Sequence, residues 1–177
     1  NNGVLKRDQV SEYLKNLGQD ERKILRDLGV KFGRYHVFLY KLIKPEAVSL
    51  RTLLWKNYHQ KYFKLEPPTF GLNFIEDKDK RDKNFMLLCG FEKFDNFFVR
   101  IDILERLFMQ IINSGSEDNK EIKLVPEMLN LLGCNKDNFK KLIQKMDYKI
   151  LEKNEDIFFK YTPKKKLKKS FNKKDNK

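Results

Sequence analysis

The hydrophobic positions in the last third of the chain follow an ordered series of helical and extended patterns. Between residues 102 and 161 they predict helix, short strand, helix, tight turn, helix, strand, turn and strand. Apolar residues recur three and four positions apart in each helical segment, which places them on one face. In chain order they are Leu104, Leu107, Phe108, Ile111 and Ile112; Val125, Met128, Leu129 and Leu132; and Phe139, Leu142, Ile143 and Met146. We expect this segment to fold as one compact unit.

Helix boundaries in this segment carry the residue types that start and stop helices. Asp102 and Glu105 suit the start of the first helix, because a carboxylate there accepts orphan amide hydrogens. Pro126 fits the first position of the second helix, and Gly133 tolerates the positive φ that ends it. Asn135 can cap the third helix.

Extended patterns supply the remaining elements. Residues 121–124 predict a short strand, and strands at 148–153 and 157–161 flank a turn at 154–156. The order of elements predicts a winged helix-turn-helix. Winged helices bind either nucleic acid or proteins, so the shape leaves both functions open. Four lysines on the third helix favour contact with phosphates, although Asp137 and Asp147 dilute their charge. They are Lys136, Lys140, Lys141 and Lys145.

The first part of the chain predicts helices. Residues 9–28 indicate two short helices, and residues 31–44 crowd aromatic and apolar side chains without a clear period, as in an extended entry into a short helix. Pro45 opens a further helix. The apolar face expected for it comprises Ala47, Leu50, Leu54, Tyr58 and Tyr62, joined on either side by Val48, Leu53 and Trp55.

A charged segment at 76–83 is expected to be a solvated linker, and strands are predicted at 85–91 and 97–101 around a turn at 93–96. The fold class expected is mainly α with small β elements (α+β). The predicted organisation is a helical accessory module at 1–75, the linker at 76–83, a β-hairpin plus winged-helix-like module at 84–162, and a disordered Lys-rich tail at 163–177.

Charge is concentrated at the end of the chain. The formal net charge is +13, and residues 163–177 hold eight lysines and one aspartate. A polyanion is therefore the expected partner, and nucleic acid is a common one. The alternative is a tail that only increases solubility. The tail lysines expected to contact nucleic acid are Lys164, Lys165, Lys166, Lys168 and Lys169.

Residues for catalysis or metal binding do not form a recognisable pattern. A Gly-rich phosphate loop is absent, and His36 and His59 lie far apart in sequence. Cys89 and Cys134 are isolated in apolar surroundings, which is typical of reduced thiols in the cytoplasm. No apolar run reaches the length of a membrane span. Because the chain opens at Asn1 without a methionine, we expect a fragment of a longer protein or a processed chain. Because no catalytic or metal-binding pattern occurs, we expect this chain to have no enzyme activity, metal or cofactor of its own.

Two segments carry a family resemblance. Residues 28–55 read LGVKFGRYHVFLYKLIKPEAVSLRTLLW, and residues 89–107 read CGFEKFDNFFVRIDILERL. Both resemble blocks in the C-terminal region of bacterial DExH-box (superfamily 2) helicases related to the RNA helicase of the mitochondrial degradosome, and Leu-Leu-Gly-Cys at 131–134 also fits. Together the matches cover roughly residues 20–150.

The resemblance implies an accessory region beside ATP-dependent motor domains that lie upstream. ATP and Mg²⁺ would be bound only by those domains, since no motor motif occurs in this chain. Partners would be nucleic acid, RNA in preference to DNA, and the motor domains of the same parent chain. The charged segment and the tail fall outside the family pattern.

Two functions are consistent with these features. The first is a region that holds single-stranded nucleic acid, with aromatic rings stacking bases above a basic surface. Its candidate residues in the first module are Arg34, Tyr35, Lys41, Lys44 and Arg51. The second is a protein-docking module that clamps the motor or recruits a partner such as a nuclease. A continuous positive surface over residues 136–145 would favour the first function, and an exposed apolar groove around residues 32–40 would favour the second. For Trp55 a core position is the favoured interpretation.

Overall fold

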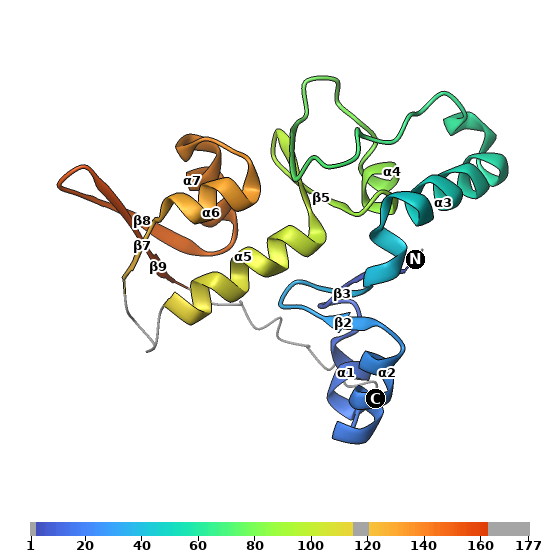
Figure 1. Ribbon diagram of the computed structural model, residues 1–177, viewed down its shortest axis with the longest axis horizontal. Helices are drawn as coiled ribbons and strands as arrows, with labels where there is room; N and C mark the ends of the chain where they lie inside the picture. The colour runs from blue at the N-terminus through green and yellow to red at the C-terminus, as the bar shows by residue number, and fades with distance from the viewer. Residues whose placement is uncertain (1–2, 115–120, 163–177) are drawn as a thin grey trace, which may run out of the picture.

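The computed structural model describes residues 3–114 and 121–162 and shows a mixed α+β fold (Figure 1). The helices, including the 3-10 helices η1 and η2, are α1 (Ser11–Asn16), α2 (Gln19–Asp27), η1 (Tyr40–Ile43), α3 (Pro45–Tyr58), η2 (Gln60–Tyr62), α4 (Lys83–Leu88), α5 (Ile101–Ser114), α6 (Pro126–Leu132) and α7 (Lys136–Lys145). None of the helices in the described residues is long and apolar enough to cross a membrane.

The strands of the described residues form three small antiparallel sheets. In the first sheet β3 (His36–Leu39) lies between β1 (Val4–Lys6) and β2 (Val30–Phe32). In the second, β6 (Phe97–Arg100) lies between β4 (Phe74–Glu76) and β5 (Phe91–Phe94). In the third, β9 (Asp156–Tyr161) lies between β7 (Ile122–Lys123) and β8 (Tyr148–Lys153). Helix α5 runs between the first sheet and the third (Figure 1).

The elements predicted between residues 102 and 161 are present in the predicted order, as α5, β7, α6, α7, β8 and β9. Gly133 ends α6 with φ of 70°, and the Asn135 side chain accepts a hydrogen bond from the Asn138 N–H at 2.8 Å. Asn154 and Glu155 both have positive φ, as the two-residue turn of a tight β-hairpin requires. Local sequence signals therefore determine the boundaries of this segment.

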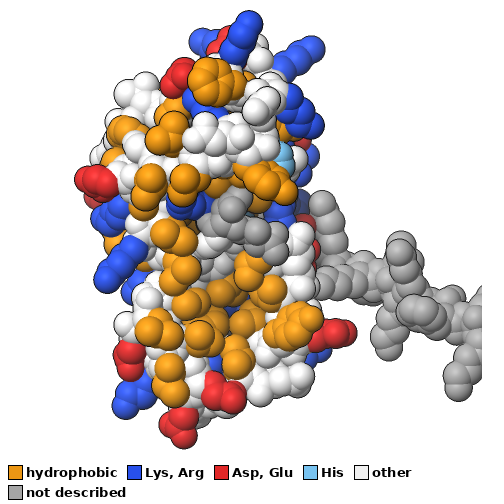
Figure 2. Space-filling model, turned by 90° about the vertical axis from the view of Figure 1, so that its right-hand side faces the viewer, with side chains coloured by type: hydrophobic (Ala, Val, Ile, Leu, Met, Phe, Trp, Pro, Cys, Tyr) orange, Lys and Arg blue, Asp and Glu red, His pale blue; other side chains and the backbone are white. Residues whose placement is uncertain are grey.

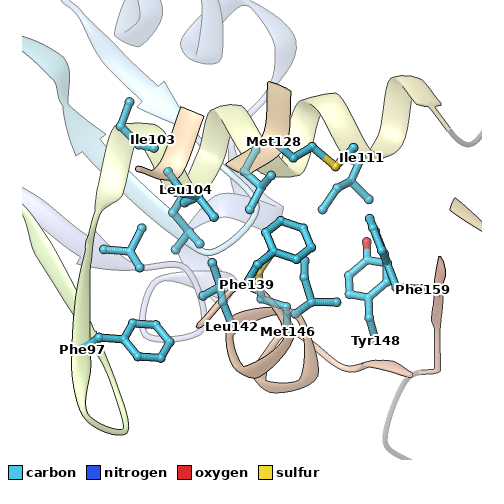
Figure 3. Packing of buried hydrophobic residues seen from close by; sticks show 14 residues of the cluster. Phe97, Ile103, Leu104, Ile111, Met128, Phe139, Leu142, Met146, Tyr148 and Phe159 are labelled. Carbon is cyan, nitrogen blue, oxygen red and sulfur yellow. The ribbon is translucent and has the colours of Figure 1, made fainter. Parts of the chain in front are cut away.

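One hydrophobic core joins α5, α6, α7 and the third sheet (Figure 3). The α7 residues predicted to lie inside are all buried, and Figure 3 shows Phe139, Leu142 and Met146 turned toward Leu104 and Ile111 of α5. The predicted α5 face is also buried at Leu104, Leu107 and Ile111, whereas Ile112 at its edge is 46% exposed.

The strand predicted at 85–91 is wrong, because this segment forms helix α4. The Asp82 carboxylate caps the helix by accepting the Phe85 N–H at 2.8 Å, and Gly90 turns the chain with φ of 86°. A short apolar run fits a buried helix as well as a strand, and the cap decides between them.

The charged segment at 76–83 is less solvated than expected at its start. Glu76 pairs with Phe97 in the second sheet, and the Asp77 carboxylate accepts a hydrogen bond from Lys93 Nζ at 2.6 Å. A second buried cluster contains Val48 from α3 together with Phe85 and Met86 from α4. Residues before and after this segment therefore pack against each other. The division of the chain into modules stays a prediction.

Helix α3 starts at Pro45 as predicted, but its buried face is not the predicted one. Val48 and Thr52 are buried, and the Thr52 hydroxyl is satisfied by donating to the Val48 carbonyl at 2.9 Å. The exposed face carries four large apolar side chains: Leu50, Leu53, Leu54 and Tyr58. Hydrophobic side chains also gather on the face seen in Figure 2, on the side where α1, α2 and α3 lie in Figure 1.

Candidate functional site

The turn between β2 and β3 is held by a single carboxylate of helix α5. Glu105 accepts the backbone N–H of Arg34 on Oε2 at 2.5 Å, and those of Tyr35 and His36 on Oε1, each at 2.9 Å. Three consecutive amides of a turn form a concave donor site suited to an anion. The predicted helix-capping role of Glu105 is therefore wrong. Asp102, at the start of α5, pairs with Arg100 at 2.7 Å and accepts the Ile103 N–H at 3.0 Å.

His36 lies between two carboxylates behind this turn. Its Nε2 lies 3.1 Å from Glu92 Oε2, and its Nδ1 lies 3.4 Å from Glu105 Oε1. Burial opposes the charged imidazole, but hydrogen bonds to the two carboxylates outweigh burial and raise the pKa of His36. Burial also opposes the charged Glu92, while hydrogen bonds from His36 and from Lys6, whose Nζ lies 2.7 Å away, lower its pKa overall. His36 is thus a buried side chain with hydrogen-bonding partners on both ring nitrogens.

The turn lies so close to α5 that position 33 has no room for a side chain, and glycine is therefore required there. A Cβ atom at this position would lie 2.3 Å from the Glu105 carboxyl carbon, well inside van der Waals contact. The Arg7 guanidinium holds the same turn from the other side by donating to the Gly33 carbonyl at 2.5 Å. The turn is thus fixed between the end of β1 and α5, and Arg34 at its tip is exposed.

A groove of about 750 Å³ lies between this hairpin and α5. Its lining includes three exposed cationic side chains, Lys31, Arg34 and Arg106, and two half-buried ones, Arg7 and Arg100. The carboxylates that line it are Asp102 and Glu105, which are already bound to Arg100 and to the turn amides. The apolar part of the lining includes Phe32, Phe38, Tyr40, Phe108 and Met109.

Of the residues predicted in the first module, Arg34 lines this groove. Tyr35 packs edge-on against Phe108 with ring centroids 5.6 Å apart, and burial raises its pKa strongly. Lys41 and Lys44 are exposed at η1 and its end, and the Arg51 guanidinium donates to the Leu42 carbonyl at 2.6 Å. The five predicted residues therefore do not form one surface.

Trp55 is not available for stacking a base. Its ring stacks on Tyr62 with centroids 4.7 Å apart and packs against Phe85 of the second buried cluster. This confirms the favoured core interpretation.

The four predicted lysines of α7 are divided between ion pairs and open solvent, and their contact with nucleic acid stays a prediction. Lys140 pairs with Glu152 at 2.5 Å, and Lys145 pairs with Asp95 at 3.0 Å. Lys136 and Lys141 are exposed. The predicted tail lysines from Lys164 to Lys169 lie outside the described residues.

The sequence did not point to Arg7, Lys31, Arg100 or Arg106 as site residues. Hydrophobic period shows which face of α5 is buried, but it does not show that residues 31–34 lie beside α5. In comparisons with family models, curated proteins and solved structures, the chain matches none. The function is therefore argued from the groove itself.

Proposed function

We propose that this chain is an accessory region that binds nucleic acid in the groove between the β2–β3 hairpin and α5. The observation that carries the proposal is the charge of this groove. Five cationic side chains and two carboxylates line it; Arg100 is paired with Asp102, and Lys31, Arg34 and Arg106 are exposed. A groove with an excess of exposed cations binds polyanions, and phosphate contacts supply most of the affinity for nucleic acid.

The resemblance to helicases adds support, because its two segments meet at this site. Gly33, Arg34 and His36 belong to the segment 28–55, and Glu105 belongs to the segment 89–107. A region of this kind would hold a single strand beside upstream ATP-dependent motor domains and act by binding, with no reaction of its own.

The C-terminal unit has a supporting role in this proposal. Its order of α5, β7, α6, α7 and a β8–β9 hairpin is that of a winged helix-turn-helix, and we propose this classification for it. Two of the four α7 lysines are neutralised by ion pairs, so we assign the main contact to the groove and a secondary contact to Lys136 and Lys141.

A second candidate function, protein docking, is favoured by helix α3. Leu50, Leu53, Leu54 and Tyr58 are each more than half exposed on this helix. A contiguous apolar surface of this size marks an interaction site more often than a free surface. The groove around residues 32–40 is apolar in part, as the docking interpretation required, but its cations favour a polyanion.

Fluorescence anisotropy with single-stranded RNA and DNA at two salt concentrations tests the proposal. The double variant Arg34→Glu/Arg106→Glu should weaken binding at least about tenfold and flatten the log–log salt slope by about 1.4, because each phosphate contact to a single strand contributes about 0.7. The control Lys23→Glu/Lys64→Glu makes the same change of charge at exposed positions outside the groove.

Three outcomes are informative. A loss confined to the groove variant supports the proposal. Equal losses in both variants show that net charge, not the groove, attracts the strand. If the unaltered chain binds neither RNA nor DNA, the proposal fails and protein docking becomes the preferred function.

A further inference from the structure

Four aromatic rings line the groove, and three of them, Phe32, Tyr40 and Phe108, have a cation over the face. The Arg34 guanidinium lies 5.6 Å from the centre of the Phe108 ring. The Lys44 ammonium lies 4.4 Å from that of Tyr40. The Arg26 guanidinium lies 5.8 Å from that of Phe32. All three cationic residues are exposed and all three rings are half-buried, so mobile charges stand over fixed rings.

We propose that the groove recognises single-stranded nucleic acid by stacking bases on Phe32, Tyr40 and Phe108. On binding, the cations leave the ring faces and contact the flanking phosphates. The inference rests on the proposed nucleic-acid function and adds that bases, and not only phosphates, are bound.

The rings are positioned to act as stacking platforms. Phe108 is held by the edge of Tyr35 at an interplanar angle of 82° and packs against the core of the C-terminal unit. Tyr40 packs against the cluster of Val4, Phe38 and Ile43. A ring fixed from behind needs little ordering when a base arrives, which favours binding.

The exchange of a cation for a base is favourable. A cation–ring contact at an exposed site is weaker than the stacking of a base on an aromatic side chain. The displaced Arg34 guanidinium is not lost, because Arg34 remains in the lining of a groove that would then hold a phosphate backbone. A duplex offers no free base faces, and a chain of phosphates without bases offers none at all, so both should bind more weakly than a single strand.

Lysine ammonium groups also lie over the rings of Tyr62, Phe85, Phe98 and Phe158, but none of these four rings lines the groove. Tyr58 and Phe63 are strongly exposed but do not line the groove, and they serve as matched controls. Trp55 is already stacked on Tyr62.

The experiment compares two sets of leucine variants that keep apolar bulk and remove the aromatic face. The groove set is Phe32→Leu, Tyr40→Leu and Phe108→Leu, made singly, and the control set is Tyr58→Leu and Phe63→Leu. Binding is measured for a single-stranded oligonucleotide of about ten nucleotides, for an abasic oligomer of the same length and for a duplex. Thermal melting of each variant shows that it is folded.

Each groove variant should weaken binding of the single strand by about fivefold or more, the lower end of the range for one stacked base, and leave binding of the abasic oligomer unchanged. The control variants should bind both like the unaltered chain. If folded groove variants bind the single strand as tightly as the unaltered chain, the stacking inference is overturned while the proposed function stands. If the unaltered chain binds the abasic oligomer or the duplex as tightly as the single strand, free bases are not recognised and the inference fails. If it binds no nucleic acid, the proposed function fails as well.

Discussion

Replacing Glu105 tests the contact on which the groove depends. In Glu105→Ala the backbone N–H groups of Arg34, Tyr35 and His36 lose their acceptor, and the His36 ring keeps only Glu92. Arg34 is exposed, so water can replace its acceptor. The other two amides lie deeper, and each costs about 1–3 kcal/mol when buried without a partner. Breaking a buried charge contact costs about 3–5 kcal/mol, and we expect a loss of unfolding free energy in that range.

Urea unfolding followed by circular dichroism measures this loss. Glu105→Gln is the informative comparison, because it keeps the size of the side chain and one oxygen acceptor. Its side-chain NH2 group, however, would face backbone N–H groups, which are donors themselves. We expect it to lie between the unaltered chain and Glu105→Ala. Trypsin should also cut faster after Arg34 in both variants, since the turn is released from α5. An unfolding midpoint and cleavage rate equal to those of the unaltered chain would refute the role of Glu105.

Three further predictions concern the same packing. Leu142→Ala should cost about 2–5 kcal/mol because Leu142 is fully buried, whereas Leu54→Ala, at a position 59% exposed, should change stability by no more than about 0.5 kcal/mol in the same urea titration. Gly33→Ala should cost about 1–3 kcal/mol, since its Cβ would overlap Glu105, and wild-type stability would show that the turn can move away. Melting temperature should depend on pH in two directions. Because the pKa of His36 is raised, its contribution to the free energy of unfolding is complete below pH 6.5 and is lost as pH rises through the raised pKa. Because the pKa of Glu92 is lowered, its contribution to the free energy of unfolding is complete above pH 4.5 and is lost as pH falls through the lowered pKa. The contribution of this pair should be largest between about pH 4.5 and 6.5, and a His36→Gln variant should lose the decline on the alkaline side.

The C-terminal unit was predictable because its signals are local. The signals that set its helix and strand boundaries lie within a few residues of those boundaries: Gly133, Asn135 and the turn at 154–155. The apolar stripe of α7 predicts a single buried face. Helix α3 was harder. Apolar residues occur around most of its circumference, and one buried position is Thr52, whose hydroxyl is satisfied within the helix. Spacing alone therefore selected the wrong face.

The site could be predicted only in part. Arg34 was identified from its motif, but the groove depends on contacts between residues about seventy positions apart, such as Glu105 with Tyr35. Glu105 lies on a helix where a capping or ion-pair role also fits, and nothing in the sequence shows that it faces three amides. The ion pairs of Lys140 and Lys145 were likewise set by β8 and by the β5–β6 turn, far from α7 in sequence.

The two candidate functions use different surfaces, which makes them separable and compatible. The groove is built by the β2–β3 hairpin and α5, whereas the exposed leucines lie on α3. A module that only docked would gain nothing from the three exposed cations around one groove, Lys31, Arg34 and Arg106, because desolvating charged groups opposes association. A module that only bound nucleic acid would gain nothing from an apolar face on α3, since single-stranded nucleic acid is bound by stacking and charge. The presence of both surfaces is best explained by a region that docks through α3 and presents the groove to a strand.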